Sequence, residues 1–134
     1  MNELYIPGDL AFHYIAKTTI KKYVKVYVCS TNNALSLEDM DGKLYDYIGE
    51  LYPIPLTPEI LEKNGWYGAT HSKQSDDNTK ILYKTFKRKG YPTIKVSQDL
   101  KITCELSPFI VKLESVSDLQ HLLFGLGINH EMEV

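Results

Sequence analysis

The stretch Tyr23-Val24-Lys25-Val26-Tyr27-Val28-Cys29 decides the class of the fold, because it is rich in the β-branched and aromatic residues that favour strands. A second short run of apolar and aromatic residues covers positions 10–16. The basic segment 17–22 separates the two runs, and Pro7-Gly8-Asp9 supplies turn chemistry just before them. The sequence therefore predicts a β-hairpin near the N-terminus.

Further strand-forming runs follow along the chain. We expect strands over residues 45–54, 81–86, 93–96, 102–106 and 109–113. Residues 30–42 contain Asn, Asp and Gly, which predict turns. Residues 70–79 are polar and rich in Ser, Asp and Asn, which predicts an exposed loop or hairpin tip. The turn spacing in the second half fits an antiparallel meander in a small sheet or partial barrel.

Two helices carry clear signals at their ends. In the first, Thr57 can cap the helix, Pro58 stands at the first helical position and Gly65 follows the last turn. The second begins with the capping-box pattern Ser115-Val116-Ser117-Asp118 and stops at Gly127. Its apolar face consists of Val116, Leu119, Leu123 and Leu126, broadened by Leu122.

We therefore expect an α+β protein, mostly antiparallel β-sheet or partial barrel, with one short central helix and one C-terminal helix. The tail, residues 128–134, can add an edge strand. A chain of 134 residues fits one domain, and it contains no internal repeat, low-complexity segment or linker. The sequence thus predicts a single domain over residues 1–134.

Composition is typical of a globular protein. The hydrophobic fraction of 43% and the charged fraction of 24% lie close to the average, which argues against disorder. A formal net charge of −2 gives no global field that would draw the chain onto nucleic acid or an anionic membrane. The ten tyrosines suit half-buried sheet surfaces and contact surfaces alike, so their excess leaves both interpretations open.

Cysteine usage and the N-terminus bear on the compartment. Cys29 and Cys104 lie 75 positions apart in apolar, strand-like runs, so we expect two reduced, buried thiols, with a single long-range disulfide left open. The first residues do not form a signal peptide, and no apolar run approaches the roughly 20 residues that cross a bilayer. The sequence predicts a soluble, cytoplasmic protein without a membrane partner.

Three segments resemble motifs of one protein family. Pro53-Ile54-Pro55-Leu56-Thr57-Pro58-Glu59-Ile60-Leu61-Glu62-Lys63-Asn64-Gly65-Trp66 resembles its PIPLT-E-x-L-x-K-x-G-F segment. Val116-Ser117-Asp118-Leu119-Gln120-His121-Leu122-Leu123-Phe124-Gly125-Leu126 resembles a V-x-x-LQ-x-L-x-F-x-L helix, and Gly8-Asp9-Leu10-Ala11-Phe12-His13-Tyr14 is similar to its opening strand. These are small uncharacterised proteins of anaerobic gut bacteria and their phages. The resemblance implies a phage or mobile-element setting and carries no catalytic signature; Gly125 and Gly127 depart from the family's usual ending.

No motif indicates catalysis, a metal or a cofactor. Glu38, Asp39 and Asp41 fail the spacing of a calcium loop. The histidines lack metal-ligand spacing, and glycine-rich phosphate loops and serine elbows are absent. We therefore assign no catalytic residue, no metal ligand and no cofactor, and expect no enzyme. A site assembled from distant residues, such as His71 with Asp76 or Asp77, stays open as an alternative.

Cations gather around two turns, with tyrosines interleaved. Lys17, Lys21, Lys22 and Lys25 surround the first turn, and Lys84, Lys87, Arg88 and Lys89 surround the second. If the sheet brings the turns together, they form a surface that can bind phosphates and stack a base. The predicted ligand-binding residues are Lys21, Lys22, Lys87, Arg88, Tyr83 and Tyr91. Lysines that only protect edge strands remain the alternative, and a single arginine weighs against dedicated phosphate recognition.

The leading functional hypothesis is a small, non-catalytic binding protein of a phage or mobile element. Its partner is a nucleotide-type small molecule or a host protein, and one version sequesters a nucleotide signal of host defence in a homo-oligomer with shared pockets. The alternative is a protein-interaction module that needs no small ligand and uses sheet edges and the helix Leu119–Leu126. We expect no sequence-specific binding of nucleic acid.

Overall fold

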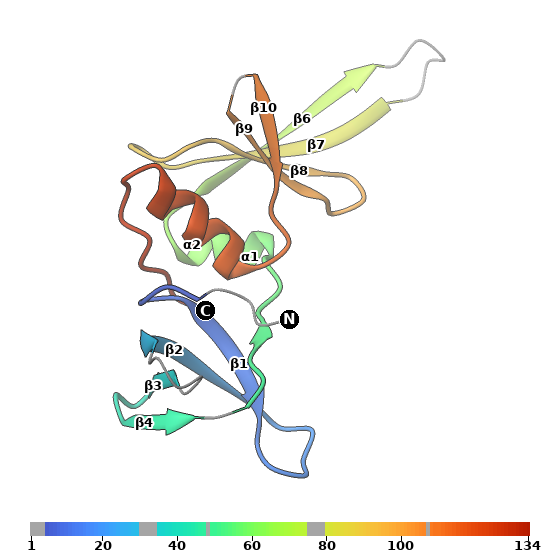
Figure 1. Cartoon of the computed structure of the whole chain (residues 1–134). Coiled ribbons are helices and arrows are strands. Elements are labelled where there is room, and N and C mark those ends of the chain that lie inside the picture. The colour runs from blue at the N-terminus through green and yellow to red at the C-terminus, as the bar shows by residue number, and fades with distance from the viewer. Residues whose placement is uncertain (1–4, 30–34, 48, 75–79, 107) are drawn as a thin grey trace. The chain divides into compact units, whose positions relative to one another are not determined.

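The computed structural model describes residues 5–29, 35–47, 49–74, 80–106 and 108–134, with the backbone alone at 28–29, 73–74 and 80–81. It confirms the α+β class, with two antiparallel sheets of five strands each and two helices (Figure 1). The chain divides into two compact units: unit 1 comprises Met1–Pro55 and Ser115–Met132, and unit 2 comprises Leu56–Glu114 and Glu133–Val134. A single cooperative domain stays a prediction of the sequence.

Unit 1 contains a sheet with the strand order β4-β3-β2-β1-β5. Its strands are β1 (Leu10–Tyr14), β2 (Lys21–Cys29), β3 (Leu35–Asp39), β4 (Leu44–Tyr47) and β5 (Tyr52–Pro53). The predicted β1–β2 hairpin is confirmed. The turn predicted around Asp39 to Gly42 is confirmed, residues 35–38 form part of a strand, and residues 30–34 lie outside the described residues. The single strand expected over 45–54 is two strands. Asp39 and Asp41 therefore mark the turn between two strands rather than part of one long loop.

The unit 1 sheet packs a small core on one face, formed by Val24, Val26 and Leu37, all 0% exposed. The second helix, α2 (Val116–Gly125), contacts β1. Its capping box is confirmed, because the Ser115 Oγ accepts the Asp118 N–H while the Asp118 carboxylate accepts the Ser115 N–H.

The apolar stripe of α2 is buried over most of its length. Val116, Leu119 and Leu123 are 0% exposed, whereas Leu126 is 44% exposed. Gly127 has a positive φ of 72° just after the C-cap, as expected for the residue that ends the helix. The expectation of an edge strand in the tail was wrong for residues 128–134, which contain no strand.

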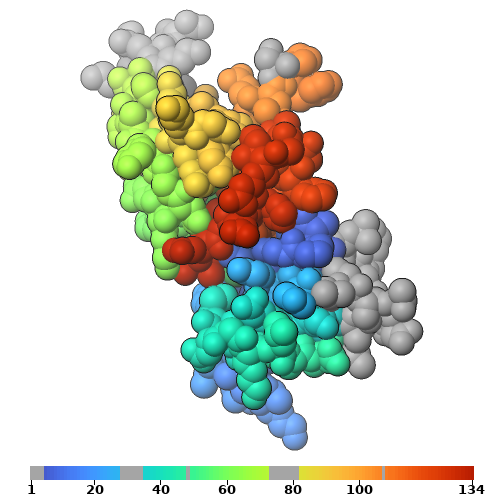
Figure 2. Space-filling view, turned by 90° about the vertical axis from the view of Figure 1, so that its left-hand side faces the viewer, coloured from blue at the N-terminus to red at the C-terminus, as the bar shows by residue number. Residues whose placement is uncertain are grey.

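Unit 2 contains a meander with the order β10-β9-β8-β7-β6. Its strands are β6 (Tyr67–Gln74), β7 (Lys80–Lys87), β8 (Ile94–Ser97), β9 (Ile102–Leu106) and β10 (Phe109–Lys112). β6 and β7 lie side by side in both views of the molecule (Figures 1 and 2). The loop expected over 70–79 was wrong as far as Gln74, because residues 70–74 belong to β6, whose residues 67–72 are exposed. Residues 75–79, the remainder of the predicted loop or hairpin tip, lie outside the described residues.

The core of unit 2 lies against one face of this sheet. Phe86, Ile94 and Cys104 follow one another in cross-strand register and are all 0% exposed. Their row continues to Gly68, where an added Cβ would lie 2.7 Å from the Phe86 ring, so the glycine makes room for that ring. Burial raises the pKa of the Cys104 thiol, which is free; the Cys29 side chain lies outside the described residues.

The predicted first helix is confirmed as α1 (Pro58–Lys63), which contacts β6. The Thr57 Oγ1 accepts the Ile60 N–H at 3.2 Å, and Gly65 adopts a positive φ of 91° beyond the helix. Leu61 is 0% exposed and anchors this short helix. Neither α1 nor α2 has the length and apolar character needed to span a membrane.

Candidate anion-binding surface

The exposed face of the unit 2 sheet carries a row of side chains aligned across all five strands. In register, the row consists of Ala69, Thr85, Lys95, Thr103 and Lys112. Register partners project to the same side of a sheet, and neighbours along a strand project to opposite sides. Because Phe86, Ile94 and Cys104 point into the core, this row points away from it, and none of its members is buried.

Parallel rows extend the surface on both sides. Tyr67 pairs with Lys87 on one side, and His71 pairs with Tyr83, which pairs with Ser97, on the other. We call this surface the lysine face; it comprises Tyr67, Ala69, His71, Tyr83, Thr85, Lys87, Lys95, Ser97, Thr103, Glu105, Ile110 and Lys112. Glu105 is the one acidic side chain among them.

The charges of the lysine face are available to a ligand. Among the residues that the structure describes, Lys87, Lys95 and Lys112 form no ion pair, and all three are exposed. With three ammonium groups against one carboxylate, the face is cationic although the whole chain carries a net charge of −2. Local charge, rather than net charge, decides whether such a surface attracts an anion.

Aromatic and hydroxyl groups occupy the part of the lysine face nearest β6. The His71 and Tyr83 rings stack with their centroids 5.2 Å apart and their planes 22° apart. The His71 Nε2 lies 2.8 Å from the Thr85 Oγ1, which fixes the orientation of the imidazole. The Lys95 Nζ lies 4.6 Å from the centroid of the Tyr83 ring. The Tyr83 ring is thus in contact with both His71 and Lys95. The exposed His71 and the 80% exposed Tyr67 offer ring surface to a ligand.

The predicted ligand-binding residues of unit 2 fall into two groups. Lys87 and Tyr83 belong to the lysine face. Arg88 and Tyr91 lie in the turn after β7, where the Arg88 Cζ is 3.9 Å from the centroid of the Tyr91 ring and 5.1 Å from that of Trp66. Trp66 is 1% exposed, so this stack braces the turn against the core.

The remaining predicted residues, Lys21 and Lys22, belong to unit 1 and occupy opposite faces of β2. The Lys21 Nζ lies 4.7 Å from the centroid of the Phe12 ring, and the Lys22 Nζ lies 4.6 Å from that of Tyr45 and 3.7 Å from the Asp39 carboxylate. The two basic turns therefore belong to different units, and their meeting in one surface stays a prediction.

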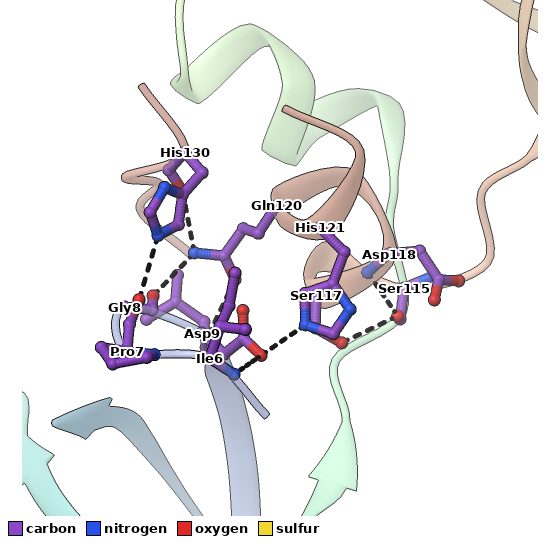
Figure 3. Close-up of polar contacts among 11 residues, drawn as sticks. Ile6, Pro7, Gly8, Asp9, Ser115, Ser117, Asp118, Gln120, His121 and His130 are labelled. Atoms are coloured by element: carbon purple, nitrogen blue, oxygen red, sulfur yellow. Dashed lines mark hydrogen bonds and ion pairs between the residues drawn. The ribbon is translucent and has the colours of Figure 1, made fainter. Parts of the chain in front are cut away.

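Two histidines of unit 1, His121 and His130, form hydrogen bonds to the turn that precedes β1. The His121 Nε2 donates to the Asp9 Oδ2 at 2.6 Å, and the Ile6 N–H donates to the same oxygen at 2.9 Å (Figure 3). Asp9 is 0% exposed, and its Oδ1 has no hydrogen-bond partner among the described residues. His130 donates from Nε2 to the Pro7 carbonyl at 3.0 Å. These contacts join α2 and the segment after it to the turn that starts β1.

His13 is also engaged within unit 1. Its Nδ1 donates to the Tyr14 carbonyl at 3.2 Å, which leaves Nε2 to accept from the Tyr45 hydroxyl at 2.9 Å. Desolvation raises the pKa of Tyr45, which keeps its hydroxyl protonated as that donor. Within the described residues, no group of three or more His, Cys, Asp or Glu side chains could hold a metal ion. Asp76 and Asp77, considered as partners of His71, lie outside the described residues.

Sequence reasoning missed Lys95, Lys112 and Thr103, the central members of the lysine face. A signal was present, because apolar residues alternate with polar ones in Ile94-Lys95-Val96-Ser97 and Ile102-Thr103-Cys104. This alternation was missed because the lysines were grouped by the turn to which they lie nearest in the sequence. Comparison with known protein families, curated proteins and solved structures finds no match to this chain.

Proposed function

We propose that this chain is a non-catalytic binding protein whose lysine face takes an anionic, nucleotide-type ligand. The observation that carries the proposal is the register of unit 2, which aligns Lys95 and Lys112 on the exposed side of a sheet whose other side is a packed core. Paired strands hold the backbone positions of these two lysines in place without the ordering cost of a loop.

The chemistry of the face suits both parts of a nucleotide. Ammonium groups and threonine hydroxyls can donate hydrogen bonds to phosphate oxygens, and charge-assisted bonds of this kind are the stronger ones. Tyr67 and His71 supply aromatic surface against which a base can stack. In the phage or mobile-element setting that the resemblance implies, such a protein would sequester a nucleotide signal of host defence, in a homo-oligomer whose stoichiometry native mass spectrometry would measure.

The test compares lysines on the two faces of the same sheet. Lys84 lies on β7 next to Thr85, is exposed, and projects to the side opposite the lysine face. Fluorescence anisotropy with fluorescein-labelled tetrathymidylate at low salt should show binding to the wild type and to Lys84→Ala. We expect at least tenfold weaker binding for the Lys95→Ala/Lys112→Ala double variant. Equal affinity of the two variants, or no binding to the wild type, would reject the proposal.

The protein-interaction alternative is favoured by one observation in unit 2. β10 is an edge strand, and its Phe109 and Ile110 are 70% and 67% exposed. An exposed apolar edge strand can pair with the same strand of a second copy. Sedimentation velocity over a range of concentrations should then detect a dimer that Ile110→Lys disrupts. A wild type that stays monomeric at every concentration would remove this alternative.

A further inference from the structure

The width of the lysine face and the spacing of its cations bear on the kind of nucleotide ligand. Five strands about 4.8 Å apart make the face about 19 Å wide from β6 to β10. Lys95 and Lys112 stand in one row two strands apart, so their backbones are about 10 Å apart. Lys87 lies on the other side of Lys95, one strand and two residues away. The cations therefore form a bent line across the strands from β7 to β10 rather than a cluster.

A single nucleotide matches this line poorly. Its phosphates are bonded to one another, so it could engage all three lysines only if their ammonium groups converged against their mutual repulsion. Lys95 is further held over the Tyr83 ring at 4.6 Å. A polymer instead carries phosphates separated by whole nucleosides and can meet the lysines one at a time.

The aromatic groups lie at one end of the line. Tyr67 and His71 both belong to β6, the edge strand, while the lysines continue to β10 at the opposite edge. Bases that leave the row of phosphates can stack on these rings, as they do on the sheet surfaces of many proteins that bind single strands. A duplex keeps its bases paired and offers none of them to a flat surface.

We infer, resting on the proposed function, that the ligand of the lysine face is a single-stranded nucleic acid, bound without sequence preference and running across the strands from β6 to β10. We expect the face, about 19 Å wide, to take about six nucleotides, which lies within the range of about 4–16 nucleotides that single-strand-binding domains cover. Three phosphate contacts give a salt dependence with a slope of about −2, since each contact on a single strand contributes about −0.7.

The deciding experiment is a length series on the full-length protein. Anisotropy competition with oligothymidylates of two to twelve nucleotides should show affinity rising to a plateau near six nucleotides, with ATP at least about 100-fold weaker. A plateau already reached with ATP or the dinucleotide would overturn the inference and leave the proposed function standing. Failure of every nucleotide to bind would remove both.

Two further arms separate stacking from charge. Tyr67→Ala should weaken dodecathymidylate binding about tenfold, the loss expected when one base no longer stacks on a ring. The same variant should bind inorganic polyphosphate as tightly as the wild type does. Lys112→Ala should lower the salt slope by about 0.7, whereas the control Lys84→Ala should not change it. Polyphosphate binding as tightly as the oligonucleotide, or a DNA hairpin competing equally well, would overturn the inference in favour of simple charge attraction.

Discussion

Unit 1 and unit 2 each contain a five-stranded antiparallel sheet, yet aromatic rings gather on one face of the first and lysines on one face of the second. In unit 1, Phe12 has Tyr14, Tyr23 and Tyr52 around it, with ring centroids 5.6, 6.2 and 5.6 Å away. Phe12 is 6% exposed, whereas the three tyrosines are 37–41% exposed. The rings thus cover one another and leave their polar edges in water.

Charges on this aromatic face oppose one another, unlike those of the lysine face. Lys25 faces Glu38 in register. The Tyr52 hydroxyl donates to the Glu50 carboxylate at 3.0 Å, a bond that raises the pKa of Tyr52. The lysine face has three lysines against Glu105 alone. The same architecture therefore supports a charge-balanced surface in one unit and an anion-attracting one in the other, which net charge and composition do not reveal.

The largest effects are expected from substitutions that empty the core of either unit, and these substitutions test whether the two units unfold together. Phe86→Ala empties the centre of the unit 2 core, and Leu37→Ala does the same in unit 1; both side chains are 0% exposed. We expect losses of about 3–5 and 2–5 kcal/mol. Because the sequence predicts one domain, hydrogen exchange in either variant should accelerate in both units. Acceleration confined to the unit that carries the substitution would establish two independent domains.

The next prediction compares two side-chain amides, one in each unit, that bind the end of the chain. The buried Gln120 accepts the Leu10 N–H at 2.8 Å. It also donates to the Gly8 and His130 carbonyls (Figure 3). Asn64 donates to the Glu133 carbonyl and accepts the Glu133 N–H, both at 2.8 Å and both exposed. Water can replace exposed partners but cannot reach buried ones.

We therefore expect Gln120→Leu to cost about 2–3 kcal/mol, because it leaves the buried Leu10 N–H and two partly buried carbonyls unpaired. Asn64→Ala should cost about 0.5–1 kcal/mol. Urea unfolding of both variants measures the difference. An equal cost for the two would mean that the Gln120 contacts are open to water in solution.

The sequence predicted where helices begin and end better than it predicted which strands pair and how the elements divide into units. Thr57, Pro58 and Gly65 fixed α1, and Ser115 with Asp118 fixed the start of α2, because capping depends on residues within one turn. The order of the strands and the division into units depend on contacts between distant residues, which local patterns do not contain. The lysine face was missed for the same reason, since Lys95 and Lys112 are 17 positions apart in the chain.

A third prediction compares a hairpin turn from each unit. Gly42, between β3 and β4, has a φ of 84°, and Leu100, between β8 and β9, has a φ of 64° with 72% exposure. A side chain in this conformation costs about 1–2 kcal/mol, which glycine avoids at some cost in unfolded-state entropy. Gly42→Ala should destabilise by about 1 kcal/mol, and Leu100→Gly should stabilise by about 0.5 kcal/mol. A destabilised Leu100→Gly variant would show that Leu100 makes contacts that outweigh its strain.

The smallest effect concerns an aspartate in each of the same two turns. Hydrogen bonds from the Lys43 and Asp41 backbone N–H groups, with Lys22 nearby, lower the pKa of Asp39. The Ser97 hydroxyl and Lys101 lower the pKa of Asp99. Both carboxyl groups have a lower pKa in the folded state than in the unfolded state. Their contribution to the free energy of unfolding is therefore fully present above the unfolded pKa of about 4, and it is lost as pH falls through the folded pKa.

Asp39→Asn and Asp99→Asn should therefore reduce stability at pH 7 and flatten its decline between about pH 5 and pH 2. Urea unfolding across this range measures the slope, with Asp41→Asn as a control for the loss of one turn carboxylate. The Lys101–Asp99 pair is exposed on both sides, so added salt should shrink the charge contribution of Lys101. The Asp39 side chain is only 11% exposed, so salt should shrink the contribution of Lys22 less. The hydrogen-bond contributions should stay in place. A variant whose stability falls with acid as steeply as that of the wild type would show that its turn opens in solution. If only one of the two variants behaved so, the two turns would differ in solution although the structure gives both aspartates the same kind of hydrogen bonds.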